Sequence, residues 1–292
     1  MKARLVWLLL CGIWGSTWLF IKLGLADLPP FSFAGIRFVI ACAIIYGLIR
    51  ARGIQLPVQR RDWLLLAVSG VLSFTINYGL IFWAEQHISS GLAALLQATT
   101  PAFGLVIAHL HLPSERMTWP KMIGVVMGVF GVGVVFSNQL SIAGGLALGG
   151  CVGVVFSSIC VAYSNVLIKA YGKDLTPAVL AAGQMFFGLI PLLLIGIPLE
   201  GNPIHYRWTP LALVSLFYLA IVGSVIAFLL YYWLVHHMDV TKTMLISLVT
   251  PVVAVLLGMV VLREKLDWRT IAGGAMIVIG IGSIVVRKRT YI

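Results

Sequence analysis

The sequence predicts an all-α integral membrane protein with ten transmembrane helices, arranged as two inverted five-helix repeats. The first observation is composition: 61% of the 292 residues are hydrophobic and only 10% are charged. A soluble fold cannot bury so much apolar surface, so the bilayer must solvate the chain. The second observation is that the second half of the sequence repeats the first about 150 residues later. Such an internal repeat predicts a duplicated architecture.

The repeat is clearest around two Thr-Pro pairs. The stretch that begins at His87 contains Thr100-Pro101, and the stretch that begins at His237 contains Thr250-Pro251. A Glu, a Trp and three Gly follow in the same order in both halves: Glu115, Trp119, Gly124, Gly131 and Gly133, then Glu264, Trp268, Gly273, Gly280 and Gly282. We therefore expect two domains, residues 1–140 and 141–292, with a binding site where the repeats meet.

Ten apolar segments each have about 20 residues, the length that a helix needs to cross the hydrocarbon. They are continuous rather than alternating, which predicts helices and not a β-barrel. The segments are 4–25, 30–49, 63–84, 88–110, 119–136, 144–170, 176–198, 210–235, 240–262 and 268–286. Because five is an odd number, the second repeat must enter the membrane upside down relative to the first.

The basic residues predict the orientation of the chain. With the N-terminus inside, 14 of the 20 Lys and Arg residues fall inside and four outside, at Arg207, Arg263, Lys265 and Arg269. This bias places both termini in the cytoplasm. The same rule accounts for the formal net charge of +11. We therefore expect a lipid bilayer and a small molecule as partners, and no nucleic acid.

The charged and sulfur-containing residues argue against an enzyme and against a cation pump. All nine Asp and Glu residues lie at helix ends or in loops, whereas ion-coupled carriers often keep a carboxylate in mid-span. The sequence has no nucleotide-binding loop, metal-ligand cluster or nucleophile–base constellation. The four cysteines fall inside apolar stretches and are interpreted as packing residues. We predict no enzymatic activity, no cofactor and no metal site.

The two prolines of the repeat are candidate hinges. Pro101 and Pro251 each lack an amide hydrogen and clash with the carbonyl four residues earlier, which belongs to Gln97 and Ser247 respectively. A freed carbonyl at membrane depth needs a partner. The partner is either a polar substrate in a central cavity, which makes Gln97 and Ser247 binding residues, or a neighbouring hydroxyl such as that of Thr100 or Thr250.

Further candidate binding residues share helix faces with aromatic side chains. Aromatic stripes in membrane helices also arise from packing or from lipid-facing belts, and that alternative stays open. Several of these aromatic residues lie too far from the segment ends for a simple interfacial belt. The candidates are Trp14, Thr17 and Trp18 in the first segment, Tyr78 and Phe82 in the third, Tyr163, Ser164 and Asn165 in the sixth, and Ser224 and Tyr231 in the eighth.

Arg37 is an intramembrane charge, seven residues inside the second segment. A charged side chain at this depth is costly and indicates a functional site by default. Arg37 either binds a carboxylate of the substrate, or has a structural role by pairing with Glu85 or with helix-end carbonyls. Gln184 occupies the repeat-related position, so only one half carries the charge.

With these motifs in place, the chain resembles the drug/metabolite transporter superfamily, in its EamA branch, over its whole length. The motifs that carry the resemblance are Trp14-Gly15-Ser16, Pro30 through Arg37-Phe38, the two Thr-Pro pairs, and Leu262-Arg263-Glu264-Lys265-Leu266 followed by Trp268, Gly273 and Gly280-Ile281-Gly282. Within the branch it is most similar to the YddG-type amino-acid exporters. It departs from the family at Pro113-Ser114-Glu115-Arg116, where a Gly-Glu pair is frequent.

The resemblance implies a ten-helix carrier of the bacterial inner membrane, monomeric or homodimeric, that exports amino acids by alternating access. We expect a small zwitterion in a central cavity, with its ammonium at the carbonyls near Gln97 and Ser247 and its side chain against Trp14, Trp18, Tyr78 and Tyr163. Such a cavity predicts broad specificity. Export of amphipathic drugs and handling of lipids are the alternatives, and both facilitated diffusion and proton antiport remain open.

Overall fold

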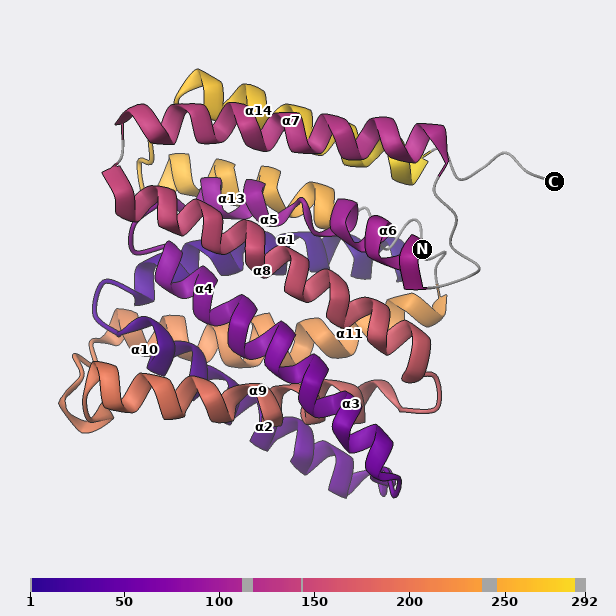
Figure 1. Cartoon of the computed structure of the whole chain (residues 1–292). Coiled ribbons are helices and arrows are strands. Elements are labelled where there is room, and N and C mark those ends of the chain that lie inside the picture. Colours follow the sequence, from indigo (N-terminus) through magenta and orange to yellow (C-terminus); the bar gives the residue numbers. More distant parts are fainter. Residues whose placement is uncertain (1, 112–117, 143, 238–245, 287–292) are drawn as a thin grey trace.

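The structure is a computed structural model, and it describes residues 2–111, 118–142, 144–237 and 246–286. The regular elements within these ranges are all helices (Figure 1), so the all-α prediction is confirmed for this part of the chain.

The first half of the chain forms seven α-helices and one wider π-helical segment, η1. In chain order they are α1 (Lys2–Gly24), α2 (Pro30–Ala51), α3 (Arg60–Gly70), η1 (Val71–Ile76), α4 (Asn77–Ala84), α5 (Ser90–Gln97), α6 (Thr100–His111) and α7 (Trp119–Ile142). The second half contains a second π-helical segment, η3, and a short 3₁₀ turn, η2. Its elements are α8 (Gly144–Tyr171), α9 (Pro177–Glu200), η2 (Pro203–His205), α10 (Pro210–Phe217), η3 (Tyr218–Ile226), α11 (Ala227–His237), α13 (Ile246–Val261) and α14 (Trp268–Val286).

Helix is present in each of the ten apolar segments that the sequence predicts. Within the described residues, seven helical stretches are long and apolar enough to cross a membrane, and three more apolar stretches are shorter: Lys121–Val135, Val249–Val261 and Trp268–Gly280. The chain is therefore a multi-pass membrane protein, while the number of ten crossings stays a prediction.

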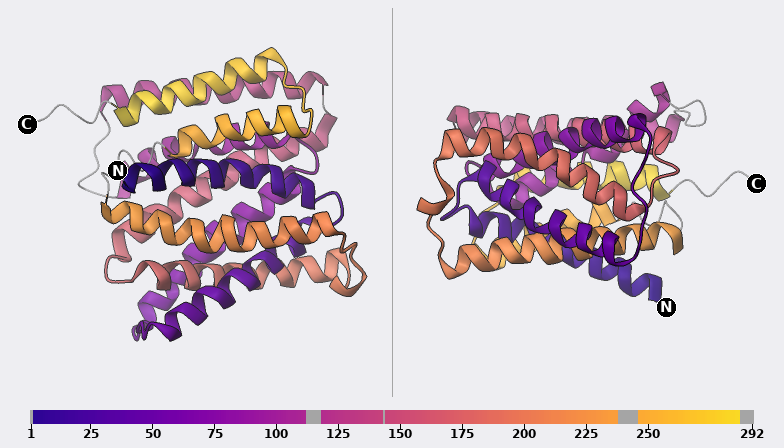
Figure 2. Two further views of the ribbon diagram at one scale, coloured as in Figure 1. Left: turned by 180° about the vertical axis from the view of Figure 1, so that it is seen from behind. Right: turned by 90° about the horizontal axis from the view of Figure 1, so that it is seen from below.

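Most of the helices run along a common direction, with α3 and α4 oblique to it, and the two halves of the chain interleave (Figures 1 and 2). On one side of the bundle α7 packs along α14, and on the opposite side α2 packs along α9. Between them, α1 packs against α13, and α8 packs against α5 and α6. Because α1 and α8 are the first helices of their halves, this pairing pattern is the one that a two-fold relation between repeats would produce.

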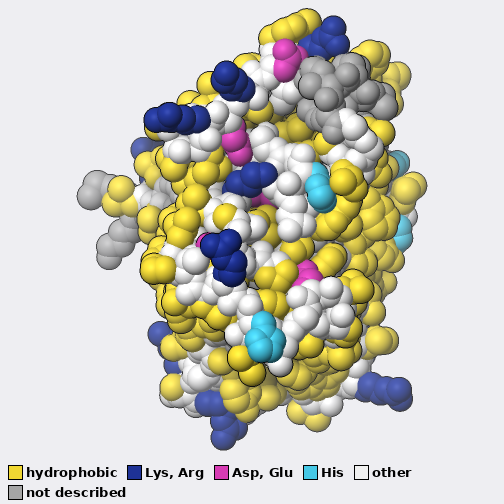
Figure 3. All heavy atoms as spheres, turned by 90° about the vertical axis from the view of Figure 1, so that its left-hand side faces the viewer, with side chains coloured by type: hydrophobic (Ala, Val, Ile, Leu, Met, Phe, Trp, Pro, Cys, Tyr) yellow, Lys and Arg dark blue, Asp and Glu magenta, His cyan; other side chains and the backbone are white. Residues whose placement is uncertain are grey.

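The bundle has two distinct ends. The first helix begins and the last helix ends at the same end (Figure 1). The opposite end, which we call the distal end, carries the connections 25–29, 85–89, 201–209 and 262–267. Figure 3 looks onto the distal end and shows charged and His side chains scattered among hydrophobic ones. The four basic residues that the sequence assigns to the outside belong to this end.

Each half carries a π-helical segment at a related place. The segments η1 and η3 begin about 150 residues apart, and each continues directly into an α-helix, α4 or α11. π-Helical turns are rare and occur frequently at functional sites. In η3 the Ser224 hydroxyl donates to the carbonyl of Leu219, 2.9 Å away. In η1 the Thr75 hydroxyl donates to the carbonyl of Gly188 in α9, at 2.7 Å.

Candidate functional site

Arg37 is the charged group at the centre of the bundle. Helix α2 carries it inward, so that only 1% of the residue is exposed. Its guanidinium carbon lies 4.9 Å from the ring centre of Tyr78, 5.0 Å from Phe38 and 6.0 Å from Phe82. Its Nε donates to the Ser224 hydroxyl at 3.0 Å. We call these five residues the arginine box; it joins α2 and α4 of the first half to η3 of the second.

The guanidinium is not fully satisfied inside the arginine box. Its Nη1 is buried and has no hydrogen-bond partner. The pairing with Glu85 that the sequence left open does not form, because both carboxyl oxygens of Glu85 also lack partners. The contacts with aromatic faces offset part of the cost of burying the charge. An unpaired buried cation still favours an anion beside it.

Gln97 lies at the centre of a second polar group. Its Nε2 donates to Oδ1 of Asn77 at 3.0 Å, and its Oε1 accepts from the hydroxyls of Ser157 and Ser158, both at 3.1 Å. Asn77 and the two serines are buried, and Gln97 is half-buried. We call these four residues the amide cluster. It brings together α4, α5 and α8, and so contains side chains from both halves.

Helix α4 connects the two polar groups. Asn77 of the amide cluster and Tyr78 of the arginine box are consecutive residues at the start of this helix, directly after η1. Consecutive residues on a helix point about 100° apart, at 3.6 residues per turn. One helical turn therefore places Tyr78 beside the guanidinium on one face and Asn77 in the amide cluster on the neighbouring face.

The structure corrects the expectation for the carbonyl freed by Pro101. The fourth segment is broken, because α5 ends at Gln97 and α6 begins at Thr100. The Thr100 hydroxyl donates to the Gln97 carbonyl at 2.8 Å, which was the alternative to a substrate contact. Pro251, in contrast, lies inside a continuous α13. The side chain of Ser247 lies outside the described part of the chain.

The aromatic candidates of the first and eighth segments lead towards the arginine box. The Trp14 ring lies 5.2 Å from that of Tyr231 and 5.9 Å from that of Phe228. From Phe228 the row continues to Phe74 and then to Tyr78, each step 5.8 Å. These rings make a continuous aromatic wall from α1 and α11 to α4.

Trp18 and Thr17 take different places next to this wall. Trp18 packs against two core groups, one that includes Phe38 and Phe82 and another that includes Leu96, the neighbour of Gln97. It therefore joins the core around α2 to the core around α5 and α8. The Thr17 hydroxyl donates to the Trp14 carbonyl at 2.7 Å, so this candidate binds its own helix.

The three candidates of the sixth segment do not join the site. Tyr163 packs its ring 5.5 Å from that of His111, at the end of α6. Ser164 is buried and donates to the Ser69 carbonyl of α3 at 3.1 Å, while Asn165 is exposed. The structure instead brings in Asn77 and Ser158, which were not among the candidates. A lone amide such as Asn77 in an apolar helix was the signal, because a buried amide requires a polar partner.

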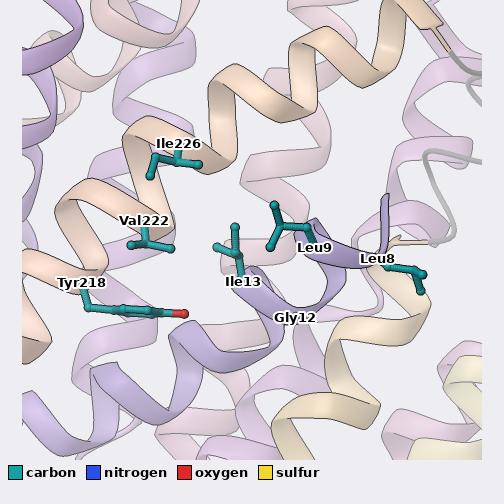
Figure 4. Close-up of a pocket in the computed structure, with 7 residues that line it drawn as sticks. All are labelled: Leu8, Leu9, Gly12, Ile13, Tyr218, Val222 and Ile226. Carbon is teal, nitrogen blue, oxygen red and sulfur yellow. The ribbon is translucent and has the colours of Figure 1, made fainter. Parts of the chain in front are cut away.

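An open groove lies on the side of the bundle, between α1 and η3 (Figure 4). Its lining is apolar apart from the Tyr218 hydroxyl: Leu8, Leu9, Gly12, Ile13, Tyr218, Val222 and Ile226. Tyr218 shares a hydrogen bond of 2.6 Å with Ser16 and stacks on Phe20 at 3.9 Å. The groove contains none of the candidate residues and faces outward from α1, where lipid would lie.

Comparison with known proteins gives a consistent picture. The model of the EamA-like transporter family matches residues 1–137 and 148–286, one stretch in each expected half. The chain is 30% identical to the uncharacterized inner membrane transporter YedA of Escherichia coli K12, over 88% of this chain and 82% of that one. It is 26% identical to the uncharacterized transporter YoaV of Bacillus subtilis 168, over 92% and 91% of the two chains. A solved crystal structure superposes with a TM-score of 0.69 at 20% identity, covering 99% of each chain, which shows a shared fold.

Proposed function

The chain belongs to the EamA-like transporter family, and from this premise we propose that it exports amino acids across the inner membrane by alternating access. Membership of the family makes it a membrane transporter. The choice of amino acids rests on the chemistry of the interior. One observation carries it: a neutral amide cluster and a single buried cation lie on adjacent faces of α4, next to an aromatic wall.

This arrangement suits a small zwitterion. The side-chain oxygen of Asn77 accepts one hydrogen bond, from Gln97, and keeps a second acceptor position for an ammonium group. It takes the place of the Gln97 backbone carbonyl, which the Thr100 hydroxyl already occupies. The aromatic wall offers apolar surface to many different side chains. We therefore expect broad specificity among neutral and aromatic amino acids.

Counterflow in proteoliposomes tests the proposal. Vesicles loaded with unlabelled phenylalanine should take up labelled phenylalanine, and leucine, tryptophan and methionine should compete for the uptake. Protein-free vesicles and vesicles with heat-inactivated protein give the background. Absence of uptake by folded, inserted protein would exclude amino acids as the cargo, and uptake of one amino acid without competition by the others would contradict broad specificity.

The lateral groove supports a second candidate function, the export of amphipathic drugs or lipids. It is apolar, carries one hydroxyl at Tyr218, and lies beside α1 at the middle of the helix (Figure 4). A cargo of this class would reach the protein from the bilayer. Counterflow of a labelled amphipathic drug or a fluorescent phospholipid, in the same vesicles and without amino-acid uptake, would favour this function over the first.

A further inference from the structure

We propose that Arg37 is the anchor for a carboxylate group of the transported molecule, so that the protein selects monocarboxylates and zwitterions and rejects amines. The inference rests on the proposed function for the identity of the cargo. Neither the fold nor the family specifies which side chain binds the carboxylate of the cargo.

The guanidinium has unmet bonding capacity. It has five N–H donors; its Nε–H donates to the hydroxyl of Ser224, and Tyr78 is a further side-chain hydrogen-bond partner. Nη1 is enclosed and has no partner. No carboxylate of the described residues forms an ion pair with Arg37. A carboxylate suits the planar guanidinium well, because it can accept two parallel N–H bonds.

The second half of the chain approaches the guanidinium closely. Gly223 precedes Ser224 in η3, and a Cβ added there would lie 3.7 Å from the Arg37 Nη2 and 2.9 Å from the Thr17 methyl group. A larger residue at this position would therefore press on Thr17 and stand directly beside the guanidinium. Gly223 and the wider π-helical turn keep the backbone of the second half close to Arg37, so that both halves can contact a carboxylate bound there.

The charge of the arginine box also favours a carboxylate. The box holds one cation, three aromatic rings and the hydroxyls of Tyr78 and Ser224. One cation balances the single charge of a carboxylate, but not the charge of a phosphate monoester, which is about −1.5 to −2 at pH 7. The repeat-related position carries the neutral Gln184, so the second half adds no cation there. These features favour a monocarboxylate over a phosphate.

Competition in counterflow tests the anchor directly. Uptake of labelled phenylalanine by the wild-type protein should be inhibited by 3-phenylpropionate, which keeps the carboxylate, and at least about tenfold less by phenethylamine, which lacks it. The tenfold follows from one charge-assisted hydrogen bond. Equal inhibition by both compounds would overturn the inference without contradicting transport of amino acids.

Variants separate the anchor from a structural role. Arg37→Gln should lower the apparent affinity for phenylalanine at least about tenfold and abolish the difference between the two inhibitors. Arg50→Gln, at an exposed position on the same helix, should leave both unchanged. If Arg37→Gln does not fold, Arg37→Lys keeps the charge and should retain the preference for carboxylates with weaker affinity. Retention of full affinity in a folded Arg37→Gln would exclude the anchor.

A binding measurement distinguishes the carboxylate anchor at Arg37 from the proposed transport of amino acids. Without any assay of transport, 3-phenylpropionate should raise the melting temperature of the wild-type protein in detergent and should not raise that of Arg37→Gln. If phenylalanine counterflow fails but this shift is present, the cargo is a different carboxylate and the anchor stands. If counterflow succeeds and the shift is absent in the wild type, the anchor is wrong and the proposed function stands.

Discussion

Gln97 organises the amide cluster, because its side chain forms hydrogen bonds with three other residues. It donates to Asn77 and accepts from Ser157 and Ser158. The two serines also donate to the Val154 carbonyl, at 2.8 and 3.0 Å, so they remain hydrogen-bonded without Gln97. We therefore expect Gln97→Ala to reduce amino-acid counterflow about tenfold, for the loss of one or two hydrogen bonds.

The stability of this variant should change little, because helices α5 and α8 keep their apolar contacts. Counterflow and the melting temperature in detergent, measured on one preparation, check both parts. Gln86→Ala, exposed in the connection after α4, is the matched control and should transport like the wild type. A wild-type rate for Gln97→Ala would remove the amide cluster from the site.

At the scale of residues, the sequence identifies which groups are unusual but not which partner each one meets. It singled out Gln97 and Arg37, and both lie at the polar centres of the bundle. It also left open whether Thr100 would bind the Gln97 carbonyl and whether Glu85 would pair with Arg37. The first contact forms and the second does not. Both outcomes depend on side-chain rotamers and on helix packing, which a single sequence does not specify.

At the scale of elements, glycines determine how closely α7 and α14 approach. A Cβ on Gly131 would lie 2.5 Å from the Gly273 carbonyl oxygen, and a Cβ on Gly273 would lie 2.6 Å from the Gly131 carbonyl oxygen. Gly131→Ala should therefore force the helices apart and lower stability by about 1–3 kcal/mol, the usual cost of overpacking. Gly133, on the same helix, has nothing within 4 Å of its added Cβ.

The matched pair makes this prediction specific to the helix contact. Gly133→Ala should be neutral or stabilising by up to about 1 kcal/mol, because Ala favours helix over Gly. Thermal unfolding in one detergent, for both variants and the wild type, measures the difference. Equal melting temperatures for Gly131→Ala and Gly133→Ala would show that the two helices do not pack through these glycines.

The sequence predicted where helices occur better than it predicted their internal form. Apolar runs and turn residues locate the ten segments, because crossing the bilayer demands length and hydrophobicity. Pro101 predicts the break of the fourth segment after Gln97, but the apolar runs do not reveal that η1 and η3 are π-helical. In η1 the Thr75 hydroxyl bonds to Gly188 of a neighbouring helix, a contact that a single sequence does not specify.

At the scale of the whole molecule, polar contacts join the two halves at the distal end. The Glu264 carboxylate accepts from the Ser90 amide and hydroxyl, both at 2.9 Å, and so caps the start of α5. The Glu200 carboxylate accepts from the amides of Phe31 and Ser32 at 2.7 Å and caps the start of α2. The negative charges lie at helix N-termini, where the helix dipole favours them. For alternating access, these contacts must break when the distal end opens.

The sequence suggested an inverted repeat, and the pairing of helices at this scale is consistent with one. The repeat and the orientation of the termini nevertheless stay predictions. Sequence similarity between the halves does not say how the halves meet, and the glutamate caps had no local signal beyond their positions at helix ends. The cap by Glu264 joins residues that are 174 positions apart.

We expect Glu85 to make the stability of the fold dependent on pH. It is fully buried after α4, and neither carboxyl oxygen has a partner. The Lys22 ammonium donates instead to the backbone carbonyls of Glu85 and Ile88. Burial raises the pKa of the Glu85 carboxyl well above its usual value of 4.5, Lys22 lowers it, and Glu264 raises it further. Two further charged or titratable groups contact the end of α4. Arg37 of α2 lies over the ring of Phe82, one turn before Glu85, and the His87 ring packs against that of Trp83.

Because its pKa is raised, Glu85 holds its proton in the folded protein at pH values where an exposed carboxyl is ionised. Its contribution to the stability of the folded state is therefore fully present below about pH 4.5 and is lost as the pH rises through the raised value. We expect the melting temperature of the wild type to fall over that range. Glu85→Gln, which is neutral at every pH, should flatten the profile, whereas Asp174→Asn, exposed in the connection before α9, should keep the slope of the wild type. An unchanged slope in Glu85→Gln would assign the pH dependence to another group and show that stability does not depend on the ionisation of this carboxyl.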